Sequence, residues 1–473
     1  MQTLDTFYID GKWLTPAPGF AQADIVNPAT ESVIGQVAMG SAADVDRAVA
    51  AAGGAFPDWS ESTREQRIAL LERIIACYQD RMEDIAQAVH LEIGAPITLA
   101  RNAQAPAGLA QFKATLDALR SFAFESTRGK HVVRREAIGV AALITPWNWP
   151  LNQIAAKVAP AIAAGCTVVL KPSEVAALDA RIFAEVLHEA GTPAGVFNML
   201  YGDGQTVGAA LSSHRDVDMV SITGSTHAGI QVAVNAAPTV KRVAQELGGK
   251  SALLVLDDAD LQTAVRSGVL HCMGNSGQTC VAPTRMLVPR RRYDEAVGIA
   301  AATAEALPVG NPADPKVAMG PLSSRAQYER VQGLIALGME EGARVVAGGP
   351  GRPENLERGF FARPTVFADV RNDMAIAQEE IFGPVLVMIP HDGDDDAIAI
   401  ANDSPYGLAG YVASADGDRA RRVATRLRVG FVRINGAPAD LGLPFGGYKQ
   451  SGNGREFGPE GIGEYLEIKS IMA

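Results

Sequence analysis

Short apolar runs alternate with helical stretches from Gly139 onward, and this alternation restricts the possible folds more than any other feature of the chain. Strands that alternate with helices pair in parallel, because the chain must cross over the sheet between neighbouring strands. The sequence therefore predicts an α/β fold with a parallel sheet. The expected strands are residues 139–144, 167–170, 196–200 and 217–222, and the expected helices are 152–164, 176–190 and 226–236.

The segment before Gly139 is expected to be mainly helical. Apolar residues recur with a 3.6-residue period between positions 65 and 90, and the helical pattern extends over 42–128. Two β segments flank it, a hairpin at Asp10-Gly11 and a basic, β-prone stretch at 130–136. We therefore expect a helical segment between two short β segments.

A second α/β region begins near Ser251 and runs to about Lys449. The chain has 473 residues, which is too long for one hydrophobic core, so two or three domains are expected. The acidic run Asp392–Asp396 is expected to form a solvated loop or the start of a helix.

The charge balance excludes several classes of function. A formal net charge of −11 argues against binding to nucleic acid or to an anionic membrane surface. The four cysteines show no paired spacing, so we expect neither a disulfide scaffold nor a metal site. No secretory signal and no apolar stretch of membrane-spanning length is visible, which indicates a cytoplasmic protein.

Polar residues follow the first two expected strands, where ligands bind in a doubly wound sheet. In Thr145-Pro146-Trp147-Asn148-Trp149-Pro150, the Asn148 amide can donate to an oxyanion, or it can simply cap a helix. In the segment 171–174, Lys171 and Glu174 can hold the two hydroxyls of a ribose. A carboxylate there repels a 2′-phosphate, which favours NAD over NADP. The alternative is a capping glutamate beside a solvated lysine.

Two glycine-containing turns are candidates for contact with a phosphate. Gly204 and Gly208 belong to a GxGxxxG pattern that misses the usual dinucleotide fingerprint by one residue. Gly224 and Ser225 join an expected strand to an expected helix, and small residues there let a helix N-terminus approach a phosphate. Ordinary βα turns explain both patterns equally well.

Cys280 is the strongest candidate nucleophile. It follows Gly277-Gln278-Thr279, a loop in which backbone and helix dipoles are expected to lower the pKa of a thiol. Glu246 lies upstream in the sequence and can accept a proton. No histidine is close enough in sequence to suggest a cysteine–histidine protease. Cys166 and Cys272 are expected to be structural, and Cys77 has no chemical context.

Two later segments complete the set of candidates. Glu380 is expected to bind a second ribose, and Phe382 to pack against a nicotinamide. Phe445, in Pro444-Phe445-Gly446-Gly447, is expected to line a substrate tunnel. A purely structural role remains the alternative for each of these residues.

Taken together, these residues resemble the aldehyde dehydrogenase family across essentially the whole chain. The matching motifs occur in the family's order: Pro146-Trp147-Asn148, 171–174, Thr223-Gly224-Ser225, Glu246-Leu247-Gly248-Gly249-Lys250, Gly277-Gln278-Thr279-Cys280, 380–384 and 444–447. Six or more ordered matches do not arise by chance.

The resemblance implies a role for each site residue. Cys280 is the nucleophile, and the Asn148 side chain forms the oxyanion hole with the Cys280 backbone N–H. Glu246 activates the water that hydrolyses the thioester after a hydride has left for NAD, and Glu456 matches a possible proton relay of some members. Lys171 and Glu174 bind the adenosine ribose and Glu380 the nicotinamide ribose. The other implied cofactor residues are Thr145, Pro146, Trp147, Ser173, Gly204, Gly208, Gly224, Ser225, Leu247 and Phe382.

The resemblance also implies a division of the chain and a fold: a Rossmann-like NAD-binding domain, a second α/β catalytic domain and a small β oligomerisation arm. The NAD-binding domain is expected at 1–117 and 137–247, and the catalytic domain at 248–448. The arm is expected to pair a hairpin at 118–136 with a C-terminal strand at 462–473. Edge pairing between subunits predicts a homodimer or homotetramer.

The substrate is less constrained than the reaction. Many relatives carry apolar residues where this chain has Asn152 and Gln153, so a neutral hydrogen-bonding group on the aldehyde is expected. Trp149 and Phe445 are expected to stack an aromatic ring. The alternative to a role in substrate binding is that Asn152 and Gln153 face solvent or a domain interface. The sequence leaves three alternative functions open: a semialdehyde dehydrogenase, a cysteine-dependent thioester hydrolase or esterase, and a catalytically inactive relative that binds NAD.

Overall fold

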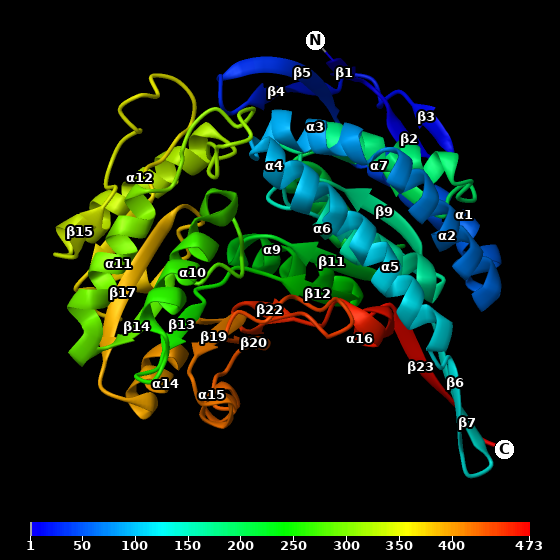
Figure 1. Ribbon diagram of the computed structural model, residues 1–473. Coiled ribbons are helices and arrows are strands. Elements are labelled where there is room, and N and C mark those ends of the chain that lie inside the picture. The colour runs from blue at the N-terminus through cyan, green and yellow to red at the C-terminus, as the bar shows by residue number, and fades with distance from the viewer. Residues whose placement is uncertain (1) are drawn as a thin grey trace.

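A computed structural model describes residues 2–473 and shows two large sheets joined in an arch, with a thin β arm extending from one end (Figure 1). The first sheet has eight strands in the order β22-β12-β11-β8-β9-β10-β2-β3. Its five central strands are mutually parallel. They are β8 (Val140–Ile144), β9 (Thr167–Lys171), β10 (Phe197–Met199), β11 (Met219–Thr223) and β12 (Arg242–Glu246).

The order of these central strands creates a site for a ligand. The chain starts at β8, moves outward through β9 and β10, and then returns to the other side of β8 through β11 and β12. A crevice opens at the carboxyl ends of the strands where the direction reverses, which here is between β8 and β11. Antiparallel strands close the two edges: β22 (Gly452–Asn453) on one side, and β2 (Phe7–Ile9) with β3 (Lys12–Leu14) on the other.

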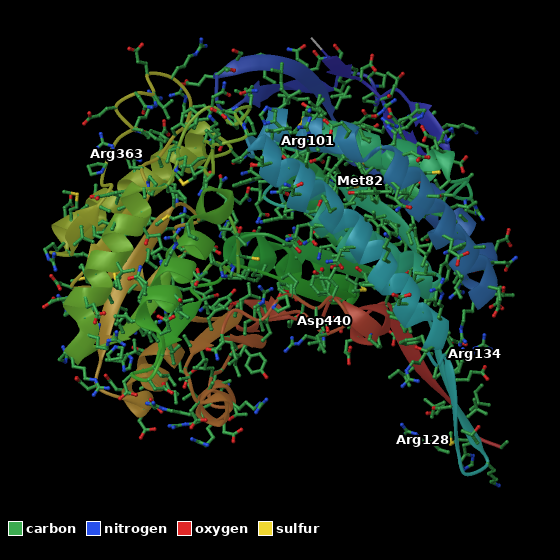
Figure 2. All side chains as sticks on the ribbon, in the orientation of Figure 1. Met82, Arg101, Arg128, Arg134, Arg363 and Asp440 are labelled. Atoms are coloured by element: carbon green, nitrogen blue, oxygen red, sulfur yellow. The ribbon has the colours of Figure 1, made fainter. Side chains whose placement is uncertain are left out.

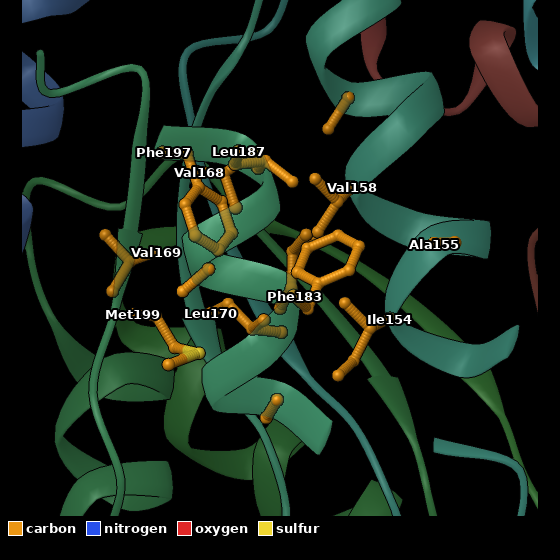
Figure 3. Close-up of a cluster of buried hydrophobic side chains, with 14 of the residues drawn as sticks. Ile154, Ala155, Val158, Val168, Val169, Leu170, Phe183, Leu187, Phe197 and Met199 are labelled. Atoms are coloured by element: carbon orange, nitrogen blue, oxygen red, sulfur yellow. The ribbon is translucent and has the colours of Figure 1, made fainter. Parts of the chain in front are cut away.

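Helices cover both faces of the first sheet. Every residue of β9 is buried, as expected for a parallel strand with helices on each side. Figure 3 shows Ile154 and Val158 of one helix and Phe183 of another packed against the side chains of β9 and β10. Each fully buried side chain of this kind stabilises the fold by about 1.5–3 kcal/mol. The covering helices are α1 (Ala42–Ser60), α2 (Arg64–Asp80), α3 (Met82–Ile93), α5 (Ala105–Ser121), α6 (Pro150–Ala164), α7 (Ala177–Glu189) and α9 (Thr226–Ala236).

The second sheet has seven strands in the order β15-β16-β17-β14-β13-β19-β20, and only β15 runs antiparallel. The strands are β13 (Ala252–Val255), β14 (Arg285–Pro289), β15 (Arg344–Ala347), β16 (Thr365–Ala368), β17 (Val385–His391), β19 (Ala409–Ala413) and β20 (Phe431–Ile434). Its helices are α10 (Leu261–Met273), α11 (Tyr293–Glu305), α12 (Arg325–Glu340), α14 (Asp394–Asn402) and α15 (Gly417–Ala424). The α/β prediction is therefore confirmed in both halves of the chain.

Besides the two-stranded pair of β18 (Tyr406–Gly407) and β21 (Tyr448–Lys449), two three-stranded sheets complete the architecture. One joins β1 (Gln2–Leu4), β5 (Ser32–Met39) and β4 (Ala21–Asn27), and no sequence pattern predicted it. The other forms the arm, in which β7 (His131–Ala137) pairs with both β6 (Glu125–Arg128) and β23 (Leu466–Ile471). Figure 2 shows Arg128 and Arg134 on this arm, away from the two large sheets.

The remaining described elements are short. They are α4 (Ile97–Leu99), the π-helices η1 (Ala100–Gln104) and η2 (Gly204–Gly208), α8 (Ala209–Ser213), the 3₁₀ turns η3 (Ala237–Thr239), η4 (Gly274–Gly277) and η5 (Arg290–Arg292), α13 (Ala375–Gln378), α16 (Gly458–Gly463), β18 (Tyr406–Gly407) and β21 (Tyr448–Lys449). None of the helices within residues 2–473 is long and apolar enough to cross a membrane.

One expectation about the elements is wrong and another is confirmed. The helical pattern does not extend to position 128, because α5 ends at Ser121 and residues 125–128 form a strand. Gly129 has a φ of 63°, so the chain turns there and β6 pairs with β7. The acidic run starts a helix, as expected: Asp394 lies in the first turn of α14, where it also forms an ion pair of 2.6 Å with Arg419.

Candidate active site

The candidate site lies where the two α/β units meet, at the switch point of the first sheet. A cavity of about 460 Å³ is lined by residues that follow β8, β11 and β12 and by residues of the second unit. Ten of the residues predicted from the sequence line this cavity: Pro146, Trp147, Asn148, Gln153, Gly224, Ser225, Leu247, Cys280, Glu380 and Phe382. The structure thus brings together side chains that are more than 200 positions apart in the chain.

The loop that carries Cys280 is held in an unusual backbone conformation. Asn275, Ser276 and Gly277 have φ values of 52°, 55° and 72°, three left-handed residues in succession. At Gly277, a Cβ atom would lie 2.1 Å from the carbonyl oxygen of Gly383, so only glycine fits there. The next residue, Gln278, is held by its own side chain, because its Oε1 accepts a hydrogen bond of 2.9 Å from Ser323 N–H.

The environment of Cys280 differs from the prediction. Burial raises the pKa of the Cys280 thiol, and the nearby carboxylates of Glu380 and Glu246 raise it further. The expected lowering of this pKa by the loop is therefore wrong, because desolvation and negative charge outweigh the backbone dipoles. The thiol consequently needs a base to take its proton when it attacks. Cys166 and Cys272 are fully buried, in agreement with the structural role predicted for them.

Asn148 is oriented by three hydrogen bonds from two different segments. Its side-chain Nδ2 donates to the Gln278 carbonyl at 3.0 Å. Its backbone carbonyl accepts from Asn275 Nδ2 at 2.9 Å and from Gln104 Nε2 at 3.1 Å. An amide nitrogen carries two hydrogens, so one N–H of Asn148 remains for a ligand in the cavity. This is the geometry that an oxyanion donor requires.

Glu246 ends β12 and is almost completely buried. Neither of its carboxylate oxygens has a hydrogen-bond partner among residues 2–473. Burial raises the pKa of Glu246 well above its usual value, Glu456 raises it further, and Lys157 partly opposes this. A buried carboxylate with no protein partner is costly to keep, which is typical of a group reserved for chemistry.

Lys157 is a functional candidate that sequence reasoning missed. Its fully buried Nζ lies 2.6 Å from Glu456 Oε1 and donates to Ser221 Oγ at 2.9 Å. The sequence did contain a signal for this residue: Lys157 is the only charged residue of α6, whose other residues are almost all apolar.

Glu380 approaches the main chain that follows Glu246. Its Oε1 accepts a hydrogen bond of 2.9 Å from Gly249 N–H. A Cβ atom at Gly248 would lie 2.3 Å from Glu380 Oε2, so the glycine permits this close approach. Burial raises the pKa of Glu380 to about 7. The ring of Phe382 meets that of Trp147 edge-on, with their centroids 5.6 Å apart.

The remaining predicted cofactor residues lie beyond the cavity lining. Lys171 ends β9, and its Nζ donates to the Gly202 carbonyl at 2.7 Å and lies 3.6 Å from Glu174 Oε2. Ser173 Oγ accepts from Val175 N–H at 3.3 Å. Gly204 and Gly208 bound the π-helix η2, and Thr145 is buried with its Oγ1 unpartnered among the described residues.

The four predicted substrate residues separate into two groups. Gln153 is buried and lines the cavity. Asn152 instead faces α5, where its Oδ1 accepts from Gln111 Nε2 at 2.9 Å. Trp149 Nε1 donates a hydrogen bond of 3.0 Å to Thr279 Oγ1. The ring of Phe445 stacks on that of Phe457, with the ring centroids 5.0 Å apart. Neither Trp149 nor Phe445 lines the cavity. Of these four residues, only Gln153 therefore lines the cavity.

The cavity and its surroundings fit a dinucleotide. Ser225 caps α9, so the N-terminus of this helix points towards the crevice at the switch point. Thr223 Oγ1 is buried without a partner among residues 2–473, and the nearest atom to a Cβ at Gly224 would be Ala228 Cβ at 3.8 Å, so the turn is not crowded. The paired Lys171 and Glu174 lie at the end of the adjacent strand, where an adenosine ribose binds in sheets of this order.

Comparison with known proteins agrees with this geometry. Residues 13–471 match the aldehyde dehydrogenase family. The chain is 53% identical over its full length to a 3-succinoylsemialdehyde-pyridine dehydrogenase of Pseudomonas sp., of which it covers 99%.

Solved structures show the same relationship. Aldehyde dehydrogenase C of Pseudomonas syringae, in complex with NAD⁺ and octanal, has a TM-score of 0.97 at 52% identity, over 99% of this chain and 96% of that one. An aldehyde dehydrogenase of Mycobacterium tuberculosis in complex with NAD⁺ has a TM-score of 0.97 at 44% identity, over 100% and 98% of the two chains. The chain therefore belongs to the aldehyde dehydrogenase family, and it is an enzyme that oxidises an aldehyde with NAD as its cofactor.

Proposed function

We propose that Cys280, Asn148 and Glu246 carry out the oxidation through a thiohemiacetal and a thioester on Cys280. The observation that carries this proposal is the arrangement of donors and acceptors at the cavity. Cys280 and Asn148 line it together, and Asn148 keeps one N–H free. Glu246 does not line the cavity, but its charge is near enough to raise the pKa of the Cys280 thiol, and both its oxygens are unpartnered among the described residues.

In the first step, the Cys280 sulfur attacks the aldehyde carbon, and the thiol proton passes to a carboxylate. The carbonyl oxygen becomes an oxyanion, which accepts hydrogen bonds from the Asn148 amide and the Cys280 backbone N–H. Such donors are worth about 3–4 kcal/mol at a developing oxyanion. When bound, NAD supplies the acceptor for the hydride that leaves the substrate carbon.

In the second step, the acyl group on Cys280 is released as a carboxylic acid. Glu246 takes a proton from water, and the resulting hydroxide attacks the thioester carbon and displaces the Cys280 thiolate. The high pKa of Glu246 suits it to this role, because a base with a raised pKa removes a proton more effectively once ionised.

Several residues of this chain would hold NAD. Glu380, with its carboxylate fixed by Gly249 N–H, would accept the hydroxyls of the nicotinamide ribose. Phe382 and Trp147 would enclose the nicotinamide, and the turn at Gly224 and Ser225 would approach the pyrophosphate. Lys171 and Glu174 would hold the adenosine ribose, where the carboxylate of Glu174 disfavours the 2′-phosphate of NADP.

The favoured substrate is a medium-sized aldehyde with a neutral hydrogen-bonding group. Gln153 places a buried amide in the same cavity as Cys280. An amide in this position can bond a keto oxygen or a ring nitrogen, and its desolvation disfavours a purely aliphatic chain. The name of the Pseudomonas sp. relative describes a semialdehyde that carries a pyridine ring, whereas the Pseudomonas syringae relative binds octanal.

Steady-state kinetics on a panel of aldehydes tests this substrate class. The panel contains an oxo-aldehyde with a pyridine ring, benzaldehyde, octanal and succinic semialdehyde, each assayed by NADH formation. The variant Gln153→Met is expected to lower kcat/KM for the pyridyl substrate relative to octanal by roughly tenfold, because one hydrogen bond is lost. Asn152→Leu is the matched control, since Asn152 faces α5. An unchanged ratio of kcat/KM for the two substrates in Gln153→Met would refute the proposed substrate class.

The arm supports a proposal about assembly and location. Ile468, Ile471 and Met472 are 67%, 44% and 81% exposed in the isolated chain. Apolar side chains on an exposed edge strand favour burial against a second copy of the chain, so we propose that the enzyme forms a homodimer or a homotetramer built from dimers.

The four free cysteines favour the reducing cytoplasm as the compartment of the enzyme.

A further inference from the structure

Gln104 is a buried glutamine that bridges two segments of the candidate site. Both hydrogens of its Nε2 are used: one bond of 3.1 Å goes to the Asn148 carbonyl and one of 3.2 Å to Asn275 Oδ1. These partners lie 44 and 171 positions away in the chain. Gln104 does not line the cavity, so it does not contact the substrate directly.

The local backbone explains how Gln104 reaches the site. It is the last residue of the π-helix η1 (Ala100–Gln104), which precedes α5. Pro106, in the first turn of α5, has no N–H and its ring clashes with the carbonyl four residues earlier. The helix widens just before this proline, and Ala105 N–H bonds to the Ala100 carbonyl instead. Such π-turns often occur at functional sites, because they redirect a side chain.

The two partners of Gln104 belong to the two halves of the oxyanion hole. Asn148 carries the side-chain donor, and Asn275 begins the left-handed stretch that leads to Cys280, whose backbone N–H is the second donor. Asn275 Nδ2 also donates to the Asn148 carbonyl, so three amides form a closed triangle. Two non-glycine residues in the left-handed region are disfavoured and persist only where their surroundings hold them.

One further observation separates positioning from simple packing. Gln104 is 1% exposed, and its Oε1 has no hydrogen-bond partner among residues 2–473. A buried unpartnered carbonyl destabilises the fold relative to an apolar side chain of similar shape. Stability alone therefore does not account for a glutamine at this position.

We propose that Gln104 is a positioning residue that clamps Asn148 and the Cys280 loop together and thereby sets the distance between the two oxyanion donors. It acts through Asn148 rather than on the substrate. The proposal rests on the roles of Cys280 and Asn148 given above, and the experiment below distinguishes its failure from theirs.

The test compares Gln104→Met with Gln111→Met. Gln111 is a matched control: it is buried on the following helix and donates through Nε2 to Asn152, which faces away from the cavity. The rate of the first turnover is measured as the burst of NADH with saturating aldehyde. Gln104→Met is expected to slow this burst by about tenfold or more, and Gln111→Met to leave it unchanged. Gln104→Glu is expected to slow it as well, because a carboxyl group carries at most one proton and cannot donate to both Asn148 and Asn275.

Two further readouts identify the route of the effect. Alkylation of Cys280 by iodoacetamide, which forms no oxyanion, is expected to proceed at the same rate in Gln104→Met as in the unmodified enzyme. The double variant Asn148→Ala with Gln104→Met is expected to be no slower than Asn148→Ala alone, because the clamp has nothing left to position.

Two results would overturn the positioning role of Gln104 if Asn148→Ala is still slow. One is an equal burst rate in Gln104→Met and Gln111→Met. The other is a double variant whose loss of burst rate is the product of the two single losses. A normal burst in Asn148→Ala would instead overturn the oxyanion role of Asn148, and the role of Gln104 with it.

Discussion

Lys157 Nζ lies 2.6 Å from Glu456 Oε1, and both charges of this buried ion pair act on the proposed base, Glu246. The two charges act on Glu246 in opposite directions: Glu456 raises its pKa and Lys157 lowers it. Ser221 Oγ accepts a second hydrogen bond from Lys157 and fixes its position. The pair therefore adjusts the pH at which Glu246 becomes a base.

Replacing Glu456 with glutamine is expected to shift the pH dependence of thioester hydrolysis. The variant removes the negative charge and leaves the Lys157 cation, so the pKa of Glu246 falls and the ionised base is present at lower pH. The rising limb of the hydrolysis rate is expected to move to lower pH by about one unit. Rates of product release between pH 5 and 9 check this, and a shift to higher pH would contradict the assignment of the pair.

Replacing Glu246 with glutamine is expected to separate oxidation from hydrolysis. Glutamine keeps the shape of the side chain but cannot take a proton from water. The first turnover should still form NADH, while steady-state turnover should fall by about 10²–10⁴. Rapid-mixing measurements of NADH show both phases. Loss of the burst together with steady-state activity would mean that Glu246 is also required for attack by Cys280.

The buried carboxyl pair of Glu92 and Asp179 predicts a pH dependence of stability. Glu92 accepts hydrogen bonds from the N–H groups of Leu178 and Asp179, and burial raises its pKa to about 7. Burial and the Glu92 charge raise the pKa of Asp179 well above its usual value. The folded state thus holds more protons than the unfolded state between about pH 4.5 and 7, so stability falls as the pH rises through this window.

Thermal melting at a fixed scan rate tests this prediction with the variant Asp179→Asn. The neutral amide removes the repulsion, so Asp179→Asn is expected to raise Tm relative to the unmodified enzyme at pH 8 by about 2–4 °C, and by less at pH 5. A difference in Tm that is the same at both pH values would show that the pair does not titrate in this range.

Replacing Glu174 with alanine is expected to weaken the preference for NAD over NADP. The Glu174 carboxylate is partly exposed beside Lys171, where it can accept ribose hydroxyls and repel a 2′-phosphate. In Glu174→Ala the repulsion disappears and Lys171 remains. The ratio of kcat/KM for NAD to that for NADP is expected to fall by roughly tenfold or more. An unchanged ratio would place the adenosine ribose elsewhere.

The sequence predicted those features that local pattern determines. Buried strands such as 167–171 have an apolar centre, and the polar residues of the site lie at or after strand ends, so the parallel sheet and its ligand edge were both predictable. The strand at 125–128 was missed because its short polar sequence resembles a helix end, and only its pairing with β7 identifies it.

The parts that could not be predicted depend on contacts between distant residues. Asn152 and Gln153 are neighbours in sequence, but successive residues of a helix point in different directions, so one faces α5 and the other the cavity. The bonds of Gln104 and the ion pair of Lys157 join distant positions. The raised pKa of Cys280 also depends on burial and on carboxylates that only the fold brings near.

The most direct measurement of the proposed chemistry is NADH formation by Cys280→Ala, with Cys77→Ala as a matched control that removes another partly buried, unpaired thiol. With aldehyde and NAD, Cys280→Ala is expected to form no NADH while it still binds NAD, and Cys77→Ala is expected to retain full activity. Persistent NADH formation by Cys280→Ala at the rate of the unmodified enzyme would contradict the proposal that Cys280 is the nucleophile.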